Sequence, residues 1–264
     1  MNDVVAAFHE YFEITNVNSV ELLREVFNLR YRVLCIEQRA PGFDASSYPD
    51  EMESDNYDRH SSHILLRHRP SGVFVGTARM ILPDPLHLNK LFPTERHMRF
   101  DPALLNTARL PRKQTGEISR LVVIRRFNRR KDELIDALEN GRNIEKWSPT
   151  VKRRFPHPML ALAVGIIRMS VDNNINHWLS VMEPALNRLL SLYGLHLDPV
   201  GPLIDHHGLR RPYYADFPHM LDRMHRNHRQ FWELVTDGGK VQPSITQRPC
   251  EGLLCEATQG EALE

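Results

Sequence analysis

The sequence predicts one α/β domain, in which a central, mixed and twisted β-sheet carries helices on both faces. Three observations support this fold class. The chain has 264 residues, of which 41% are hydrophobic, enough to bury a sizeable core. Its segments alternate between strand-like and helix-like patterns. Residues 158–174 are apolar on nearly all sides, as expected of a helix covered by other elements.

The domain is expected to span residues 1–237. Within it, residues 125–157 are polar and charged and resemble an insert. Residues 238–264 lack any periodicity, which predicts a flexible C-terminal tail. No internal repeat divides the chain.

The first predicted element is an amphipathic helix over residues 19–36. Residues 18–21 read Asn-Ser-Val-Glu, a pattern typical of a capped helix start. Behind it Leu23, Phe27 and Tyr31 recur at helical spacing, so one face of this helix should be buried.

An acidic loop and three strands are predicted next. Residues 44–58 are rich in turn formers and contain six acids and no base. Residues 62–68 and 72–82 are apolar, β-branched runs joined by Arg-Pro-Ser-Gly, which predicts a β-hairpin. After a loop punctuated by prolines, residues 117–124 predict a third strand.

The second half should add helices and strands in turn. Residues 158–174 predict the buried helix, with Pro158 in its first turn. Residues 176–182 predict a strand, residues 183–195 a helix, and residues 196–217 a strand with loops. Residues 218–239 predict one terminal helix.

The overall composition argues against several classes of function and site. A net charge of +1 argues against a general nucleic-acid binder. No apolar run is long enough for a membrane span, and the N-terminus lacks the basic start of a signal peptide. The cysteines Cys35, Cys250 and Cys255 form no disulfide framework, so we expect a reduced, cytoplasmic protein. The pair His206 and His207 lacks spaced partners, and we expect no metal site.

Buried charge is the first sign of a site. Arg79 stands inside an apolar strand, where a guanidinium is costly unless paired. The acidic loop offers the carboxylates of Glu53, Asp55 and Asp58, and Arg120 lies on the next strand. These groups should form a charge network. The residues alone leave open whether it is structural or functional.

Glu117 and Arg120 pose a geometric question. Residues three apart on a regular strand point to opposite faces. The two side chains therefore serve different surfaces, or a β-bulge lies between them.

A basic cluster follows this strand. Residues 112–131 hold eight basic residues and one acid in a chain that is almost neutral. The cluster is a solvated surface, a phosphate-binding site or a docking site for an acidic protein. Residues 125–131 contain no glycine, which argues against a backbone cradle for a pyrophosphate.

Four motifs in order resemble the acyl-homoserine-lactone autoinducer synthases. They are LRYRVLCIEQR at 29–39, EMESDNYD at 51–58, GTARMIL at 76–82 and EISRLVV at 117–123. The later chain, residues 158–215, resembles bacterial acyltransferases associated with the PEP-CTERM/exosortase system, which are related to N-acyl amino acid synthases. The resemblance covers roughly residues 15–220. It implies the GNAT-type acyltransferase fold.

One departure from the autoinducer synthases concerns the acceptor. That family carries a Gly-Trp pair after the first helix, where this sequence has Gly42 and Phe43. This difference argues against S-adenosylmethionine as the amine substrate. The resemblance then implies an N-acyl amino acid synthase, which transfers a long-chain acyl group from acyl carrier protein to an amino acid. An autoinducer synthase or a non-catalytic module that binds acyl groups or their carrier are the alternatives.

The resemblance also implies site residues. The donor would be an acyl-phosphopantetheine thioester, with no tightly bound cofactor. Glu117 would be the general base. The catalytic set implied is Glu117, Arg120, Asp55 and Asp58. The substrate-binding set is Arg30, Arg79 and Phe27, with backbone N–H groups of Leu121, Val122 and Val123 near the oxyanion. The carrier-docking set is Arg125, Arg126, Arg129, Arg130 and Lys131.

The apolar residues Met159, Leu162, Ile166 and Met169 recur along the predicted buried helix. They are either the floor of an acyl tunnel or ordinary core.

Overall fold

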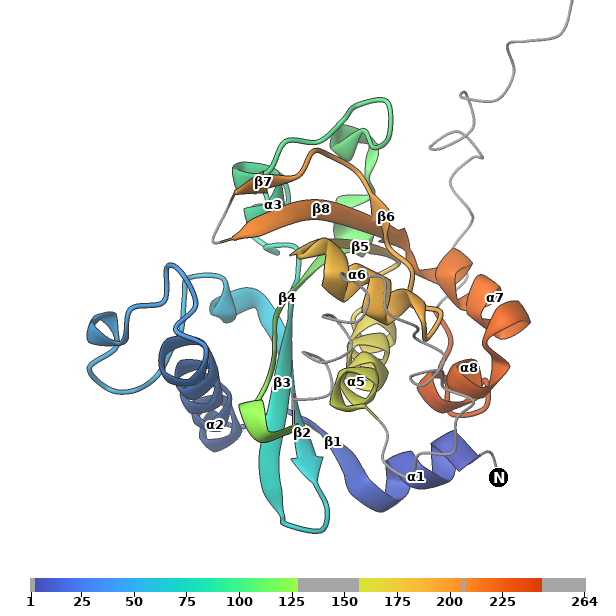
Figure 1. The fold of residues 1–264 in the computed structure, drawn as a ribbon. Helices are drawn as coiled ribbons and strands as arrows, with labels where there is room; N and C mark the ends of the chain where they lie inside the picture. The colour runs from blue at the N-terminus through green and yellow to red at the C-terminus, as the bar shows by residue number, and fades with distance from the viewer. Residues whose placement is uncertain (1–2, 128–156, 206–207, 244–264) are drawn as a thin grey trace, which may run out of the picture.

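A computed structural model describes residues 3–127, 157–205 and 208–243. Its centre is an eight-stranded sheet in the order β1-β2-β3-β4-β5-β8-β6, with β7 paired to β8 (Figure 1). Strands β4 and β5 are parallel and the other neighbours are antiparallel. The predicted mixed sheet is therefore confirmed. The strands are β1 (Phe12–Asn16), β2 (Ser61–His68), β3 (Val73–Ile81), β4 (Thr115–Val123), β5 (His177–Met182), β6 (Asp198–Pro199), β7 (Ile204–Asp205) and β8 (Leu209–Asp216).

Helices cover both faces of the sheet, as predicted. Helix α2 (Val20–Tyr31) packs against β2 and β3 from one side, and α5 (Pro158–Asp172) packs against the same strands from the other (Figure 1). Helices α1 (Asp3–Tyr11) and α8 (Arg229–Val235) pack together, and α8 also contacts α5 and α7 (Phe217–Asn227). Shorter helices are α3 (Pro93–His97) and α6 (Pro184–Ser191). Short 3-10 turns occupy Ala45–Ser47, Asp58–His60, Thr107–Arg109 and Arg112–Gln114.

Helix α2 begins one residue after the predicted start, with Ser19 as its cap in place of Asn18. The Ser19 side chain accepts a hydrogen bond of 3.2 Å from the Leu22 N–H. The α-helix ends at Tyr31, and the chain continues as a π-helix over Arg32–Glu37. The predicted helix is thus one continuous helical segment, whose last part, Arg32–Glu37, has the wider turns of a π-helix.

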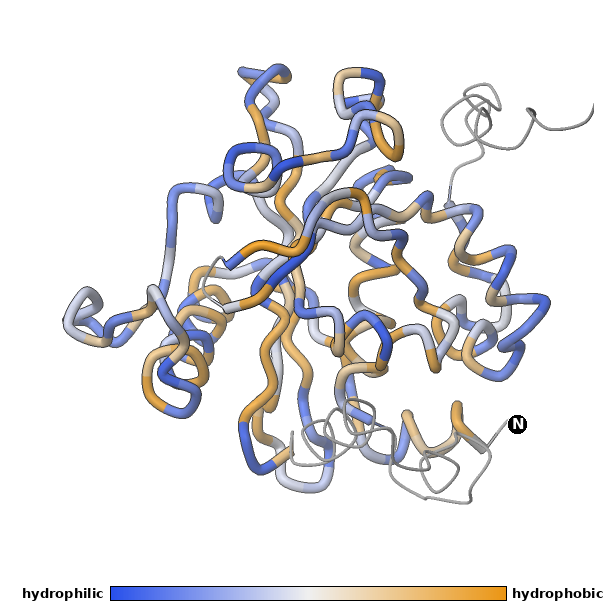
Figure 2. Tube along the Cα trace, turned by 45° about the horizontal axis from the view of Figure 1, so that its top comes forward, coloured by the Kyte–Doolittle hydropathy of each residue, from blue (hydrophilic) through white to orange (hydrophobic). Residues whose placement is uncertain are grey.

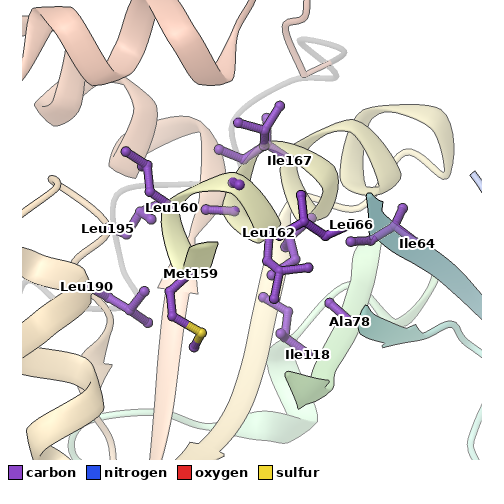
Figure 3. Packing of buried hydrophobic residues seen from close by; sticks show 14 of the residues in the cluster. Ile64, Leu66, Ala78, Ile118, Met159, Leu160, Leu162, Ile167, Leu190 and Leu195 are labelled. Atoms are coloured by element: carbon purple, nitrogen blue, oxygen red, sulfur yellow. The ribbon is translucent and has the colours of Figure 1, made fainter. Parts of the chain in front are cut away.

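Helix α5 is the centre of the main core. Twelve of its fifteen residues are buried. Figure 3 shows Ile64, Leu66 and Ala78 of the sheet beside this helix, and Figure 2 shows hydrophobic residues concentrated on the inner strands and helices. The close approach depends on Gly165, because a Cβ there would lie 2.8 Å from Ile64 Cδ1.

Substituting Gly165 with Val should therefore destabilise the fold by about 1–3 kcal/mol, because the added methyl groups overpack the contact with β2. The midpoint of urea denaturation measures this. Gly165→Ala is the control, since its gain in helix propensity, roughly 1 kcal/mol, opposes the smaller clash. A Val variant as stable as the parent would contradict this packing.

The structure corrects two of the predicted elements. The single terminal helix predicted at 218–239 is broken at His228 into α7 and α8. The loop between β3 and β4 holds α3 and two 3-10 turns. The predicted strand at 176–182 and the helix at 183–195 are confirmed as β5 and α6, although α6 ends at Ser191.

Strands β4 and β5 pair over only part of their length. Their register runs from Thr115 opposite His177 to Ile118 opposite Ser180. Beyond that point β4 continues to Val123 beside β3, while β5 continues to Met182 beside β8. The two parallel strands therefore part in the middle of the sheet.

Candidate functional site

A cavity of about 300 Å³ opens where β4 and β5 part. Residues 117–123 of β4 form one wall, and residues 180–183 form the other. The cavity has a polar part, which includes Glu117, Arg120 and Arg210, and an apolar part. The apolar lining includes Met159, Ile166, Leu186, Leu190, Leu195 and Leu197.

Helix α5 supplies part of this apolar lining. Met159 and Ile166, two of the four recurring residues of that helix, line the cavity. Figure 3 shows Met159 between Ile118 and Leu190, both of which also line it. Leu162 and Met169 are buried in the main core instead.

The predicted charge network exists and is buried. Arg30 pairs with Glu53 and, at 2.8 Å, with Asp58. Arg79 bonds Asp55 at 2.7 Å and Asp58 at 2.9 Å. The side chains of Arg30 and Arg79 are 0% and 2% exposed. Because each guanidinium meets two carboxylates, the desolvation of these charges is offset by paired hydrogen bonds.

The network sets the ionisation of its acids. Burial alone would raise the pKa of Asp58, but the Arg30 and Arg79 guanidiniums hold it well below its usual range. The pKa of Glu53 and that of Asp55 are lowered in the same way, against burial, by their arginine partners. All three acids are therefore ionised at neutral pH.

A β-bulge answers the question posed by Glu117 and Arg120. Thr77 lies opposite Val122 and Arg79 lies opposite Ser119, so β4 holds one extra residue at this point. Arg120 takes a left-handed φ of +50°, which costs a non-glycine residue about 1–2 kcal/mol.

The bulge turns Arg120 toward the charge network. Its Nη2 donates to Glu53 at 2.8 Å and to Asp55 at 3.1 Å. Its guanidinium also lies 4.8 Å from the centre of the Phe43 ring, a cation–π contact on the cavity wall. These contacts offset the backbone strain.

Glu117 stands apart from the network. It is 4% exposed and accepts a hydrogen bond of 2.8 Å from the Thr94 N–H of α3. Burial raises the pKa of its carboxyl to about 7, against the opposing effects of the Thr94 N–H and Arg79. A carboxylate on a cavity wall with a pKa near neutrality is a candidate general base.

The other predicted site residues divide into those that line the cavity, one behind the network, and those at the surface. Leu121, Val122 and Val123 line the cavity. Phe27 packs under the Arg30 guanidinium and against His63, behind the network. The side chains of Arg125 and Arg126 are exposed just past β4, and the Arg125 N–H donates to Glu37 at 2.7 Å. The predicted docking residues Arg129, Arg130 and Lys131 lie outside the described residues.

Several cavity residues were missed from the sequence. Thr94, His97, Arg210 and the apolar residues after β5 carry no motif. The sequence signal that points to these segments is a proline at the first turn of a short helix, Pro93 in α3 and Pro184 in α6.

His63 lies under the network with both ring nitrogens lacking a hydrogen bond among the described residues. Burial lowers its pKa to about 4, although Asp58 opposes this. Its folded pKa is thus below the unfolded value of about 6.5, so the unfolded chain binds more protons between pH 6.5 and 4.

Stability should therefore fall as the pH drops through this window, and His63 should account for about 2 kcal/mol between pH 7 and 5. Urea unfolding at both pH values measures the change. In His63→Gln, the difference between the free energies of unfolding at pH 7 and pH 5 should be smaller by about 2 kcal/mol. An unchanged difference would mean that His63 does not titrate in this way.

No described helix is long and apolar enough to cross a bilayer. Within the described residues, no three His, Cys, Asp or Glu side chains are grouped so that they could hold a metal ion.

Known proteins that are similar to this chain have the same type of fold. The family model described as Acetyltransferase (GNAT) domain matches residues 29–137. The curated proteins gave no match. Among solved structures, TofI in a ternary complex with an inhibitor and MTA is 18% identical, with a TM-score of 0.53 over 81% of this chain and 96% of that chain.

Two further solved structures are synthases by description. BjaI with MTA, a CoA-dependent acyl-homoserine lactone synthase, is 19% identical, with a TM-score of 0.50 over 90% of this chain and 92% of that chain. FeeM, an N-acyl amino acid synthase, is 12% identical, with a TM-score of 0.49 over 80% and 94%. The matches to TofI and BjaI establish the fold alone, which is GNAT-like.

Proposed function

We propose that this protein is an N-acyltransferase that moves a long-chain acyl group from the thioester of acyl carrier protein to the amine of an amino acid. The observation that supports this most is the placement of Glu117. A buried carboxyl with a pKa of about 7 lies in the polar part of a cavity that also has an apolar part.

The first step requires a neutral amine, because an ammonium ion has no lone pair for attack. Glu117 accepts the proton, directly or through a water molecule. A pKa of about 7 leaves a useful fraction of this carboxyl ionised at neutral pH. The amine nitrogen then attacks the thioester carbonyl carbon.

The second step collapses the tetrahedral intermediate. The C–N bond is retained and the C–S bond breaks, so the phosphopantetheine thiolate leaves and takes up the proton that the new amide nitrogen releases. Residues 121–123, past the point where β5 pairs with β4, line the cavity, and their backbone N–H groups are our choice for oxyanion donors.

The acyl chain is assigned to the apolar part of the cavity. This part is bordered by Met159, Ile166, Leu190, Leu195 and Leu197. Each buried methylene contributes about 0.8 kcal/mol, so a long chain gains enough to be held firmly.

The carrier is assigned to the far end of β4. Arg125 and Arg126 are exposed there, and the sequence continues with further basic residues. Acyl carrier protein is acidic, so a basic surface would steer it and contact its phosphate. We also propose, from the resemblance of residues 158–215, that the enzyme works in the cytoplasm of bacteria with a PEP-CTERM/exosortase system.

The test is a product screen. The purified protein is mixed with palmitoyl acyl carrier protein and the twenty amino acids, and new N-acyl species are sought by mass spectrometry. One dominant product would support the proposal and name the acceptor. If the thioester stays intact, S-adenosylmethionine is added. A lactone product would then favour homoserine-lactone synthesis, and none would favour a non-catalytic binding module.

A further inference from the structure

The first turn of α3 contacts Glu117 and carries a buried hydroxyl that has no partner. Thr94 donates its N–H to Glu117 Oε2 at 2.8 Å. The residue is 1% exposed, and its Oγ1 forms no hydrogen bond with any residue that the structure describes. Native proteins seldom leave a buried hydroxyl unpaired, because the loss of its hydrogen bonds to water is costly.

This hydroxyl lies beside the Glu117 carboxyl. Both residues line the cavity. Burial raises the pKa of Glu117, while the Thr94 N–H and the Thr94 hydroxyl both lower it. A hydroxyl has this effect only when it is close enough to stabilise the ionised carboxylate. The two groups are therefore neighbours, although they are not hydrogen-bonded in this structure.

The turn that carries Thr94 is fixed by its own neighbours. The Glu95 carboxylate accepts the Phe92 N–H at 2.9 Å, and Arg112 Nη1 donates to both Glu95 oxygens at 2.8 Å. The Arg112 guanidinium also lies 4.6 Å from the centre of the Phe92 ring. Because these contacts hold the backbone in place, rotation of the Thr94 side chain is enough to turn its hydroxyl toward Glu117.

The two ionisation states of Glu117 differ in what they need from Thr94. A neutral carboxyl carries a proton of its own, whereas a carboxylate only accepts hydrogen bonds, on two oxygens with about four sites. The Thr94 N–H fills one of these sites. A buried carboxylate gains most from a second donor, because hydrogen bonds to an ionised group are roughly twice as strong as neutral ones.

We propose that the Thr94 hydroxyl donates a hydrogen bond to the Glu117 carboxylate when Glu117 is ionised, and so holds the base in position to take the proton of the acceptor amine. This inference rests on the proposed function for the role of Glu117, and it makes Thr94 a positioning residue. The hydroxyl proton stays on Thr94. Two donors from one residue fix the orientation of the carboxylate, as proton transfer requires.

Direct contact with the acceptor amine is the competing role for this hydroxyl, since its oxygen can also accept an N–H. Because Thr94 is 1% exposed, however, it offers almost no surface to a ligand. Glu117 is already in contact with the same residue. This difference favours Glu117 as the partner of the hydroxyl.

The test compares Thr94→Val and Thr94→Ser with the parent protein. Valine has nearly the shape of threonine without the hydroxyl, serine keeps the hydroxyl, and both keep the N–H that bonds Glu117. Thr77→Val is the matched control, because the Thr77 hydroxyl is also buried but donates to the Ile64 carbonyl at 2.7 Å.

The first readout is the free energy of unfolding by urea at pH 5 and pH 9, which requires no substrate. At pH 5, where Glu117 is mostly neutral, Thr94→Val should be at least as stable as the parent, because a methyl group replaces an unpaired hydroxyl. Loss of the hydroxyl raises the folded pKa of Glu117 further above its unfolded value. The stability of Thr94→Val relative to the parent should therefore fall by about 1.4 kcal/mol between pH 5 and pH 9, the equivalent of one pKa unit.

The controls separate this effect from a general loss of stability. Thr94→Ser should show no such fall, and Thr77→Val should be destabilised equally at both pH values. Besides Thr94, the charges of Arg79 and Glu95 act on Glu117, and His97 is a further titratable group on the cavity wall. All three are unchanged in these variants. When Glu117→Gln is added to Thr94→Val and to the parent, the pH-dependent difference should disappear.

The second readout is the pH profile of kcat/KM with palmitoyl acyl carrier protein and the best amino acid from the screen. The parent profile should bend near pH 7, where Glu117 ionises. In Thr94→Val the bend should lie about 1 pH unit higher, so kcat/KM should fall most, roughly 3–10-fold, near pH 6. Thr94→Ser should return the bend to near its parent position.

Equal stability differences at pH 5 and pH 9 in Thr94→Val, or a pH-dependent difference that persists with Glu117→Gln, would overturn the inference while leaving the proposed reaction intact. A change confined to KM for the amino acid would also overturn it and would assign the hydroxyl to the acceptor amine. Absence of turnover in the parent would contradict the proposed function, and the unfolding comparison would still decide whether Thr94 bonds the ionised Glu117.

Discussion

Glu117→Gln should lower kcat by roughly 10²–10⁴-fold, the usual contribution of a general base, and leave KM for both substrates nearly unchanged. Glutamine has the same shape and keeps an oxygen that can accept the Thr94 N–H, which donates to Glu117 at 2.8 Å. The fold should therefore be kept. Steady-state kinetics with palmitoyl acyl carrier protein and the amino-acid acceptor measure the loss.

The pH dependence gives this prediction a second readout. The base must be ionised, and burial raises the pKa of Glu117 to about 7. In the parent enzyme kcat/KM should thus rise between pH 6 and 8. The parent profile should also bend near pH 7, where Glu117 ionises, whereas Glu117→Gln should lack that bend and keep only the steady rise caused by deprotonation of the acceptor amine in solution. A retained bend near pH 7, or full activity, would mean that another group takes the proton.

The same substitution should raise stability at alkaline pH. The folded pKa of Glu117 lies above its unfolded value of about 4.3, so ionising it in the folded protein is unfavourable. Stability is lost as the pH rises from the unfolded pKa through the folded one. At pH 8, Glu117→Gln should therefore gain about 3–4 kcal/mol, measured by urea unfolding, as expected where function opposes stability.

Arg79→Met should lower the free energy of unfolding by about 3–5 kcal/mol, because Asp55 and Asp58 each lose one of their two arginine partners inside the network. Asp55 and Asp58 bond Arg79 at 2.7 and 2.9 Å, and its Nε donates to Ser119 at 2.9 Å beside the bulge. Losing it should free both the acidic loop and the bulged part of β4.

The matched control is Arg32→Met. Arg32 also pairs with a carboxylate, Glu37 at 3.0 Å, but its side chain is 50% exposed. Its loss should cost less than about 1 kcal/mol. Equal effects of the two substitutions in urea denaturation would show that burial of the network contributes little.

Much of the fold follows from local patterns in the sequence. The capping pattern at residues 18–21 and the apolar spacing behind it predict α2, although the cap is Ser19, and the apolar residues of 158–174 predict the buried helix. The network was also predictable, since Arg79 in an apolar strand requires partners and the acidic loop supplies them. The bulge was one of two stated alternatives, and the register confirms it.

The cavity could not be predicted in the same way. It arises because β4 and β5 stop pairing after Ile118 and Ser180, a property of the whole sheet that no short stretch encodes. Thr94 and Arg210 reach it from segments more than a hundred residues apart. The break at His228 was missed because the helical pattern of α7 continues into α8.

The central claim is transfer of an acyl group, and its most direct test is a mass balance. Palmitoyl acyl carrier protein, the amino acid chosen by the screen and the purified protein are mixed, and thioester, free carrier and N-acyl product are quantified together. The account predicts one N-acyl amino acid and one free carrier for each thioester consumed, at a rate that Glu117→Gln nearly abolishes. Consumption of the thioester with release of free fatty acid alone, or no consumption by the folded protein, would contradict it.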